Sequence, residues 1–182
     1  MFEWHGFRIL TDPTFDPPGG EYKNGPVVLE KVTGPALAPE ALGRVDVVLL
    51  SHDHHHDNLD HSGRAFLSRV PHVITTTEGA ERLGGRAIGL ALWQSVEIPG
   101  ADGRLLRITG TPAQHGPAHL QRGAVMGFVV APADAPDTAL YFSGDTVWFD
   151  GIAEVAQQFP IRLAVLFNGG SASQQSDHLP SR

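Results

Sequence analysis

The stretch SHDHHHDNLD, at residues 51–60, places four histidines and three aspartates within ten positions. Imidazole and carboxylate groups are the side chains that bind zinc and other borderline divalent ions. The chain has ten histidines, and half of them share one segment: His52, His54, His55, His56 and His61. Because histidine is neutral and able to bind a metal near pH 7, this clustering predicts a metal site.

Two later motifs repeat the arrangement in which polar side chains follow an apolar strand. His52 and His54 come directly after the valine-rich run at residues 45–50, which predicts a strand buried on both faces. Residues two apart in an extended segment face the same side, so both imidazoles can meet one ion. His115 follows LLRITG within TPAQHGP, and Asp145 follows ALYF within SGDT. Three histidines and a carboxylate at strand ends predict a zinc-type site with an open position for water.

The elements that must position these residues alternate along the chain. Strands and short helices interleave, which predicts a layered α/β protein. We expect strands at residues 7–10, 27–32, 45–50, 73–75, 105–108, 125–130, 140–143 and 163–167, and helices at 38–42, 58–70, 77–83 and 151–159. No repeat or linker divides the chain, so we expect one domain at residues 1–170. Residues 171–182 are polar and without periodicity, which predicts an irregular tail.

Composition narrows the classes of partner. The chain has 182 residues, 13 of them Lys or Arg and 20 Asp or Glu, which gives a net charge of −7. The absence of any basic run argues against nucleic-acid and anionic-membrane partners. The chain has no cysteine, which excludes disulfides and thiolate ligands. The sequence shows neither an apolar run long enough for a membrane span nor an N-terminal export signal, so we expect a cytoplasmic protein. We expect its substrate to be a small molecule. A homo-oligomer is an open alternative.

The order of SHDH, TPAQHGP and YFSGDT, each at a strand end, resembles the metallo-β-lactamase superfamily of metal-dependent hydrolases. The early TDPTF is similar to the branch that contains ascorbate-6-phosphate lactonase and N-acyl-phosphatidylethanolamine phospholipase D. The resemblance runs over residues 7–170. It implies an α/β (α+β) fold, a four-layer αββα sandwich, with one or two metal ions at one edge of the two sheets. Zn²⁺ is the expected ion, and Mn²⁺ or Fe²⁺ are the alternatives.

The first ligand loop departs from the pattern H-x-H-x-D-H of this superfamily. Counted from His52, the aspartate position holds His56 and the histidine position holds Asp57, so the two types are swapped or the loop is shifted by one residue. The resemblance implies His52, His54 and His115 at the first ion, Asp57 at the second, Asp145 between both ions, and His55 or His56 as a further imidazole or a solvent-facing neighbour.

The resemblance also implies roles and absences outside this loop. Asp12, in TDPTF, matches a buried aspartate that accepts hydrogen bonds beside the metals. The superfamily supplies one more histidine after the bridging aspartate, but His178 lies in the polar tail and is not assigned that role. MFEWHGFRIL starts where the second strand of the first sheet would, so we expect that sheet to lack its first strand. The expected fold is therefore incomplete at both termini, as in a shortened chain.

The function that the resemblance implies is metal-assisted hydrolysis of an ester, lactone, amide or phosphodiester bond. Asp57 or Asp145 would orient the water or accept its proton. The alternative is a non-catalytic metal-binding fragment, because the second ion lacks a ligand. Asp60 has its own alternative role, as the residue at the N-terminus of a helix.

Overall fold

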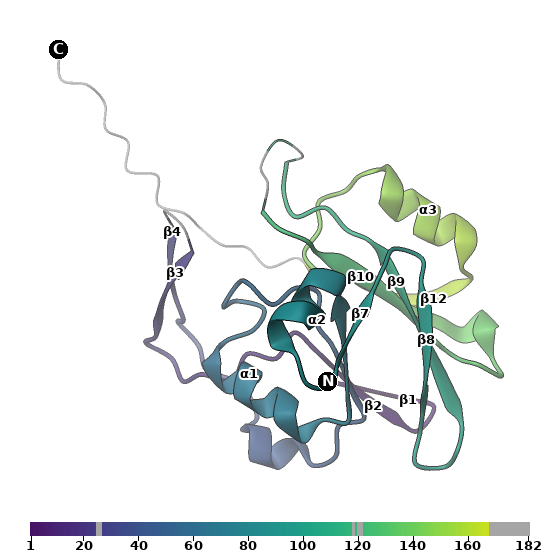
Figure 1. The fold of residues 1–182 in the computed structure, drawn as a ribbon, viewed down its shortest axis with the longest axis horizontal. Coiled ribbons are helices and arrows are strands. Elements are labelled where there is room, and N and C mark those ends of the chain that lie inside the picture. The colour runs from purple at the N-terminus through teal and green to yellow at the C-terminus, as the bar shows by residue number, and fades with distance from the viewer. Residues whose placement is uncertain (25–26, 118, 120–121, 168–182) are drawn as a thin grey trace.

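The computed structural model describes residues 1–24, 27–117, 119 and 122–167, and places two five-stranded sheets face to face (Figure 1). The first sheet has the order β1-β2-β5-β6-β7, with strands β1 (Phe2–Trp4), β2 (Phe7–Thr11), β5 (Val47–Leu49), β6 (His72–Thr76) and β7 (Ala87–Leu90). The second has the order β12-β11-β10-β9-β8, with strands β8 (Ser95–Pro99), β9 (Leu105–Pro112), β10 (Met126–Pro132), β11 (Ala139–Phe142) and β12 (Ile161–Val165).

Short helices and a separate hairpin complete the described part of the chain. The hairpin pairs β3 (Glu21–Asn24) with β4 (Val27–Glu30). The helices are α1 (His61–Phe66), α2 (Thr77–Leu83) and α3 (Asp150–Gln158), with single 3₁₀ turns at η1 (Pro39–Leu42), η2 (Leu67–Arg69) and η3 (Pro136–Thr138). None of the helices in the described ranges is long and apolar enough to cross a bilayer.

Alternation along the strands creates three separate apolar layers. On β5, Val47 and Leu49 face the second sheet and join the central core, while Val48 and Leu50 face outward to α1. On the second sheet, α3 covers the outer face through Val155. Because each sheet is covered on both faces, helix, sheet, sheet and helix form four layers. The expected αββα sandwich is confirmed.

The first sheet begins with β1, a strand that the sequence analysis did not expect at these residues. The expectation that this sheet lacks the first strand of the superfamily stays a prediction. β1 pairs antiparallel with β2, with Trp4 opposite Phe7. His5 and Gly6 form the two-residue turn, and both have positive φ, 47° and 83°. This geometry matches the right-handed twist of a hairpin and favours glycine. The signal was in the sequence, since Trp-His-Gly-Phe has a turn glycine between two aromatic residues.

The helix expected at residues 58–70 begins later, and its start fixes the loop around it. Asp60 is the N-cap of α1, and its carboxylate accepts a 2.7 Å hydrogen bond from the Gly63 N–H. The same buried carboxylate accepts the N–H groups of Phe15 and Asp16 at 2.9 and 2.7 Å, and pairs with Lys31 Nζ at 2.8 Å. Asp60 therefore joins the loop after β2 to the helix after β5.

The backbone of α1 also lies directly against the loop that follows β2. A Cβ at Gly63 would collide with the carbonyl oxygen of Pro13. Asp16 adds a second carboxylate, which accepts the Tyr22 O–H at 2.8 Å and the Ser62 N–H at 2.8 Å. Burial opposes ionisation of Asp16, but these hydrogen bonds outweigh it and hold the pKa of Asp16 well below its usual range. The loop that carries Asp12 is thus fixed on α1.

Residues 168–182 lie outside the described part of the chain. The domain boundary expected at residue 170, the tail expected at 171–182, and His178 all fall there, and these expectations stay untested.

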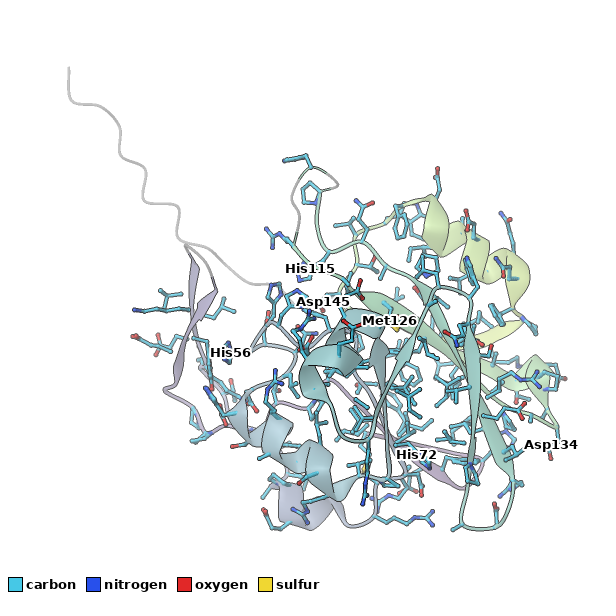
Figure 2. All side chains as sticks on the ribbon, viewed as in Figure 1. His56, His72, His115, Met126, Asp134 and Asp145 are labelled. Carbon is cyan, nitrogen blue, oxygen red and sulfur yellow. The ribbon has the colours of Figure 1, made fainter. Side chains whose placement is uncertain are left out.

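We predict that Asp60→Ala will lower the free energy of unfolding by about 3 kcal/mol, because it leaves three N–H groups and one ammonium without their buried acceptor. Asp60→Asn keeps the shape but has one acceptor oxygen, so we expect about half the loss. Urea unfolding followed by circular dichroism measures both. Asp134→Ala is the control, since Asp134 is exposed at the far side of the molecule (Figure 2). An unfolding midpoint of Asp60→Ala equal to that of Asp134→Ala would contradict the role of Asp60.

Candidate metal centre

Four strand ends meet at one edge of the two sheets. Asp12 follows β2 and His52 follows β5 in the first sheet, whereas His115 follows β9 and Asp145 follows β11 in the second. His115 and Asp145 lie next to each other in Figure 2, and His115 Nε2 is 3.6 Å from Asp145 Oδ2. The packing of the two sheets therefore brings together residues that are far apart in the sequence.

Three imidazole nitrogens converge at this edge. His55 Nδ1 lies 3.0 Å from His52 Nε2 and 3.1 Å from His115 Nε2. Two overlapping groups have ligand atoms within 4.8 Å of one another: His52, His54 and His55, and His52, His115 and Asp145. Four of the expected ligands, His52, His54, His115 and Asp145, are thus brought together, and so is His55.

The donor set fits a divalent ion. Zinc bonds to imidazole nitrogen are about 2.0–2.1 Å, so two nitrogens at tetrahedral angles are about 3.3 Å apart, close to the observed spacing. Burial and the neighbouring imidazoles lower the pKa of His52 to about 2 and that of His55 to about 4. The pKa of His115 is also lowered, chiefly by burial. The three rings are therefore neutral at pH 7, the state in which imidazole binds a metal.

Ser51 determines which nitrogen of His52 is free for a ligand bond. The Ser51 hydroxyl donates to Asp12 Oδ1 at 3.0 Å, so its only proton is in use. The same oxygen lies 2.9 Å from His52 Nδ1, which must then carry the proton and donate it. His52 Nε2 is left with its lone pair directed at the centre. Such outer hydrogen bonds fix the tautomer and orientation of metal-binding histidines.

Asp12 reaches Ser51 through an unusual backbone conformation. Its φ is 38°, in the left-handed region that aspartate tolerates better than most residues. Oδ1 also accepts the Ser51 N–H at 2.7 Å. Burial, with a smaller effect from Asp145, raises the pKa of Asp12 to about 8, against hydrogen bonds from Ser51 and Asn58 that lower it. The structure thus places Asp12 behind His52, with Ser51 between them.

Asn58 is a buried polar residue that the sequence analysis did not select. It is 3% exposed, and its Nδ2 donates to Ser51 Oγ at 3.2 Å. Its amide group also lowers the pKa of Asp12 and of Asp145. Its neighbours gave a signal, since an amide between Asp57 and the capping Asp60 is flanked by charged groups. Asn58 connects the carboxylates behind the centre to the one inside it.

His54 differs from the other imidazoles because its Nε2 has a protein partner. Nε2 lies 2.6 Å from the carbonyl oxygen of Arg122, to which it donates. Gly123 has φ 87°, and a Cβ at this position would collide with the His54 ring. His54 therefore ties the segment after His115 to the loop that carries His52.

Asp57 and His56 lie at the margin of the centre. Asp57 is exposed and belongs to neither group of converging ligand atoms among the described residues. Its negative charge still raises the pKa of Asp145 and of His55, so it acts on the centre from nearby. The His56 ring stacks on Tyr22 with centroids 4.9 Å apart. The structure therefore brings neither residue into the ligand cluster.

Comparison with known families agrees with this geometry. The profile of the family described as "Beta-lactamase superfamily domain" matches residues 7–179. The chain belongs to the β-lactamase superfamily.

Individual relatives share about a quarter of their residues with this chain or fewer. A "UPF0173 metal-dependent hydrolase" of Caldivirga maquilingensis is 27% identical over 180 residues, which cover 92% of this chain and 65% of that protein. The chain thus spans a little less than two thirds of the length of that relative. In fold it is similar to an isothiocyanate hydrolase from Delia radicum gut bacteria (TM-score 0.68, 23% identity, 90% of this chain and 66% of that one). A possible metal-dependent hydrolase from Veillonella parvula has the same TM-score, 0.68, at 19% identity, with 88% and 64% of the two chains covered.

We predict that Ser51→Ala will weaken zinc binding about 10- to 100-fold, because His52 loses the partner that fixes its tautomer. Competition with a chromophoric chelator measures the affinity. Ser68→Ala is the matched control, since Ser68 bonds only a local carbonyl on the exposed surface. Equal zinc affinity in the two variants would show that Ser51 does not orient His52.

Proposed function

We propose that the chain is a metal-dependent hydrolase whose first ion is held by His52, His55, His115 and Asp145. The observation that carries the proposal is the convergence of three neutral imidazole nitrogens beside a carboxylate. His55 Nδ1 lies 3.0 Å from His52 Nε2 and 3.1 Å from His115 Nε2, and His115 Nε2 lies 3.6 Å from Asp145 Oδ2. The named relatives support the activity class. Zn²⁺ is the proposed ion, because three imidazoles with one oxygen ligand suit it, and Mn²⁺ and Fe²⁺ are the alternatives.

The choice of His55 follows from a loop with one residue more than the superfamily pattern. When His55 is counted as the second histidine, Asp57 falls at the aspartate position and Asn58 at the final histidine position. The spacing supports this count, because His55 rather than His54 lies within 3.1 Å of both other imidazoles. His54 instead bonds the Arg122 carbonyl.

The second ion is the weaker one in this proposal. Asp57 and Asp145 would supply carboxylates, but Asn58 presents an amide, whose Oδ1 suits zinc less well than an imidazole does and whose nitrogen is a donor. Its Nδ2 already donates to Ser51. We therefore propose that the described residues hold one ion tightly and a second one weakly.

The residues around the centre can move a proton and hold a ligand in place. A bound divalent ion supplies a Lewis acid, which lowers the pKa of water from 15.7 to about 7. Burial raises the pKa of Asp145, but a bound cation would lower it, so we assign Asp145 to holding the ion. Asp57, on the exposed side of the centre, is the residue positioned to accept a proton and pass it to solvent. Ser51 and Asp12 keep His52 in its binding tautomer.

The proposed substrate is a small molecule in the cytoplasm with an ester, lactone, amide or phosphodiester bond. The TDPTF segment favours the lactonase and phospholipase D branch, because Asp12 takes the position described behind His52. The rival function is metal binding without catalysis. Asn58 favours it, because an amide in place of an imidazole weakens binding of the second ion.

We predict that His52→Ala, His55→Ala and His115→Ala will each lower zinc content below about 0.1 ion per chain at stoichiometric zinc, because each removes one of three imidazole ligands. We expect His54→Ala to keep about one ion. Elemental analysis after dialysis measures the content. His72→Ala is the control, since His72 lies on β6 away from the centre (Figure 2). Loss of zinc in His54→Ala with retention in His55→Ala would overturn the choice of His55.

We predict that the zinc-loaded chain will hydrolyse at least one of a γ-lactone, 4-nitrophenyl acetate and bis-4-nitrophenyl phosphate, and that Asp145→Asn will lower kcat about 10²- to 10⁴-fold through loss of the carboxylate that holds the ion and orients its water. Steady-state kinetics with metal content measured on the same samples tests this. Asp134→Asn controls for a change of surface charge. Full zinc occupancy without turnover of any probe would reject the hydrolase and favour the non-catalytic alternative.

A further inference from the structure

A cleft lies alongside the loop that carries His52. Its volume is about 250 Å³, and its walls are the ligand loop, α1 and α2. The polar groups in the wall include Asp53, His54, His56, His61, Arg64 and Arg82. The cleft also contacts His55, so it adjoins the metal centre, but its arginines have no part in that centre.

Two guanidinium groups from different helices converge on one carboxylate in this cleft. Asp53 is 4% exposed and accepts Arg82 Nε at 3.0 Å. Arg64 Nη2 donates to the Asp53 backbone carbonyl at 2.7 Å and lies 3.9 Å from its carboxylate. One buried carboxylate therefore faces two positive charges, which leaves an excess of positive charge.

The other acidic group in the wall does not offset this excess. The Asp60 carboxylate is paired with Lys31 and with backbone N–H groups. Glu78 and Glu81 act on Arg82 from α2, but neither lines the cleft. Arg64 and Arg82 thus contribute the positive charge in the wall of the cleft.

Both arginines keep donors available for a ligand. The side chains of Arg64 and Arg82 are 47% and 48% exposed. Arginine has five N–H donors in a planar fork, which matches the oxygens of carboxylate and phosphate groups. Arg64 donates through Nη2 to the Asp53 carbonyl oxygen, whereas Arg82 places both Nε and Nη2 on the Asp53 carboxylate, so Arg64 has fewer of its donors engaged. His56 and His61 also line the cleft, where the His56 ring stacks on Tyr22 and His61 Nδ1 lies 3.2 Å from Asp16 Oδ2.

We propose that this cleft binds an oxyanion, a carboxylate or phosphate group, carried by the substrate. That the anion belongs to a substrate rests on the proposed hydrolase function, but binding of the anion does not require turnover. Because His55 lines the cleft and belongs to the ligand cluster, an anion held by Arg64 and Arg82 places the rest of the molecule beside the centre. The substrate class is then an anionic small molecule.

Direct binding tests the cleft without any reaction. Isothermal titration with inorganic phosphate and, separately, with acetate compares the wild type with Arg64→Gln, at constant ionic strength, in zinc-loaded and chelator-treated protein. Arg69→Gln is the matched control, because Arg69 is half exposed next to α1 and pairs only with Glu40 outside the cleft. Arg64→Lys keeps the charge without the fork.

We expect one or both anions to bind the wild type and Arg69→Gln, and to bind Arg64→Gln at least about tenfold more weakly. Arg64→Lys should lie between them, and it serves as the test variant if Arg64→Gln does not fold. The anion that binds more tightly identifies the substrate group. Binding by neither anion, or equal binding by Arg64→Gln and Arg69→Gln, would overturn the proposal.

Kinetics extends the test to the substrate. Mono-4-nitrophenyl succinate is anionic and 4-nitrophenyl acetate is neutral, and Arg64→Gln should raise KM about tenfold for the first and less than twofold for the second. Equal effects on both esters would reject the role in substrate recognition. Absence of ester hydrolysis in the wild type would count against an esterase function alone, since anion binding is measured independently.

Discussion

The site depends on one buried serine at the junction of the two sheets. The backbone N–H of Ser51 donates to Asp12, at the end of β2 in the first sheet, and its carbonyl oxygen accepts the Met126 N–H from β10 in the second. Its hydroxyl bonds Asp12, His52 and Asn58. Ser51 therefore links the two sheets at the edge where ligands from both must meet, beside the core that packs them together. A shift of one sheet against the other would separate His52 from His115.

The ligand loop has two chemically different sides. One side presents neutral imidazoles, whose pKa values are lowered by burial, to a carboxylate whose own pKa is raised. The other side presents Asp53 to two guanidinium groups. Each acidic side chain that the loop buries has a defined set of donors, which satisfies the requirement that buried charges be paired. Because these donors come from α1, α2 and Lys31, the surrounding fold and not the loop alone determines its shape.

The sequence predicted the parts that depend on local pattern. The buried strand β5, the helix at residues 77–83 and the order of His52, His115 and Asp145 at strand ends all follow from apolar periodicity and turn residues. It did not select Asn58, and it placed His54 at the first ion where we propose His55, because these depend on which way a loop turns after its strand. His52 and His54 would share a face in an extended segment, but the loop bends there, so the third residue comes into reach. Packing between distant segments decides such cases, and no local pattern records it.

The contact between His54 and the segment after His115 has a consequence for how this protein can diverge. The imidazole fills the space that any Cβ at position 123 would need, and its Nε2 bonds the preceding carbonyl. A side chain at position 123 would meet both this ring and a φ of 87°, so a smaller residue at position 54 removes only the first obstacle. We therefore expect relatives that keep a histidine at position 54 to keep glycine at position 123, although 68 residues lie between the two.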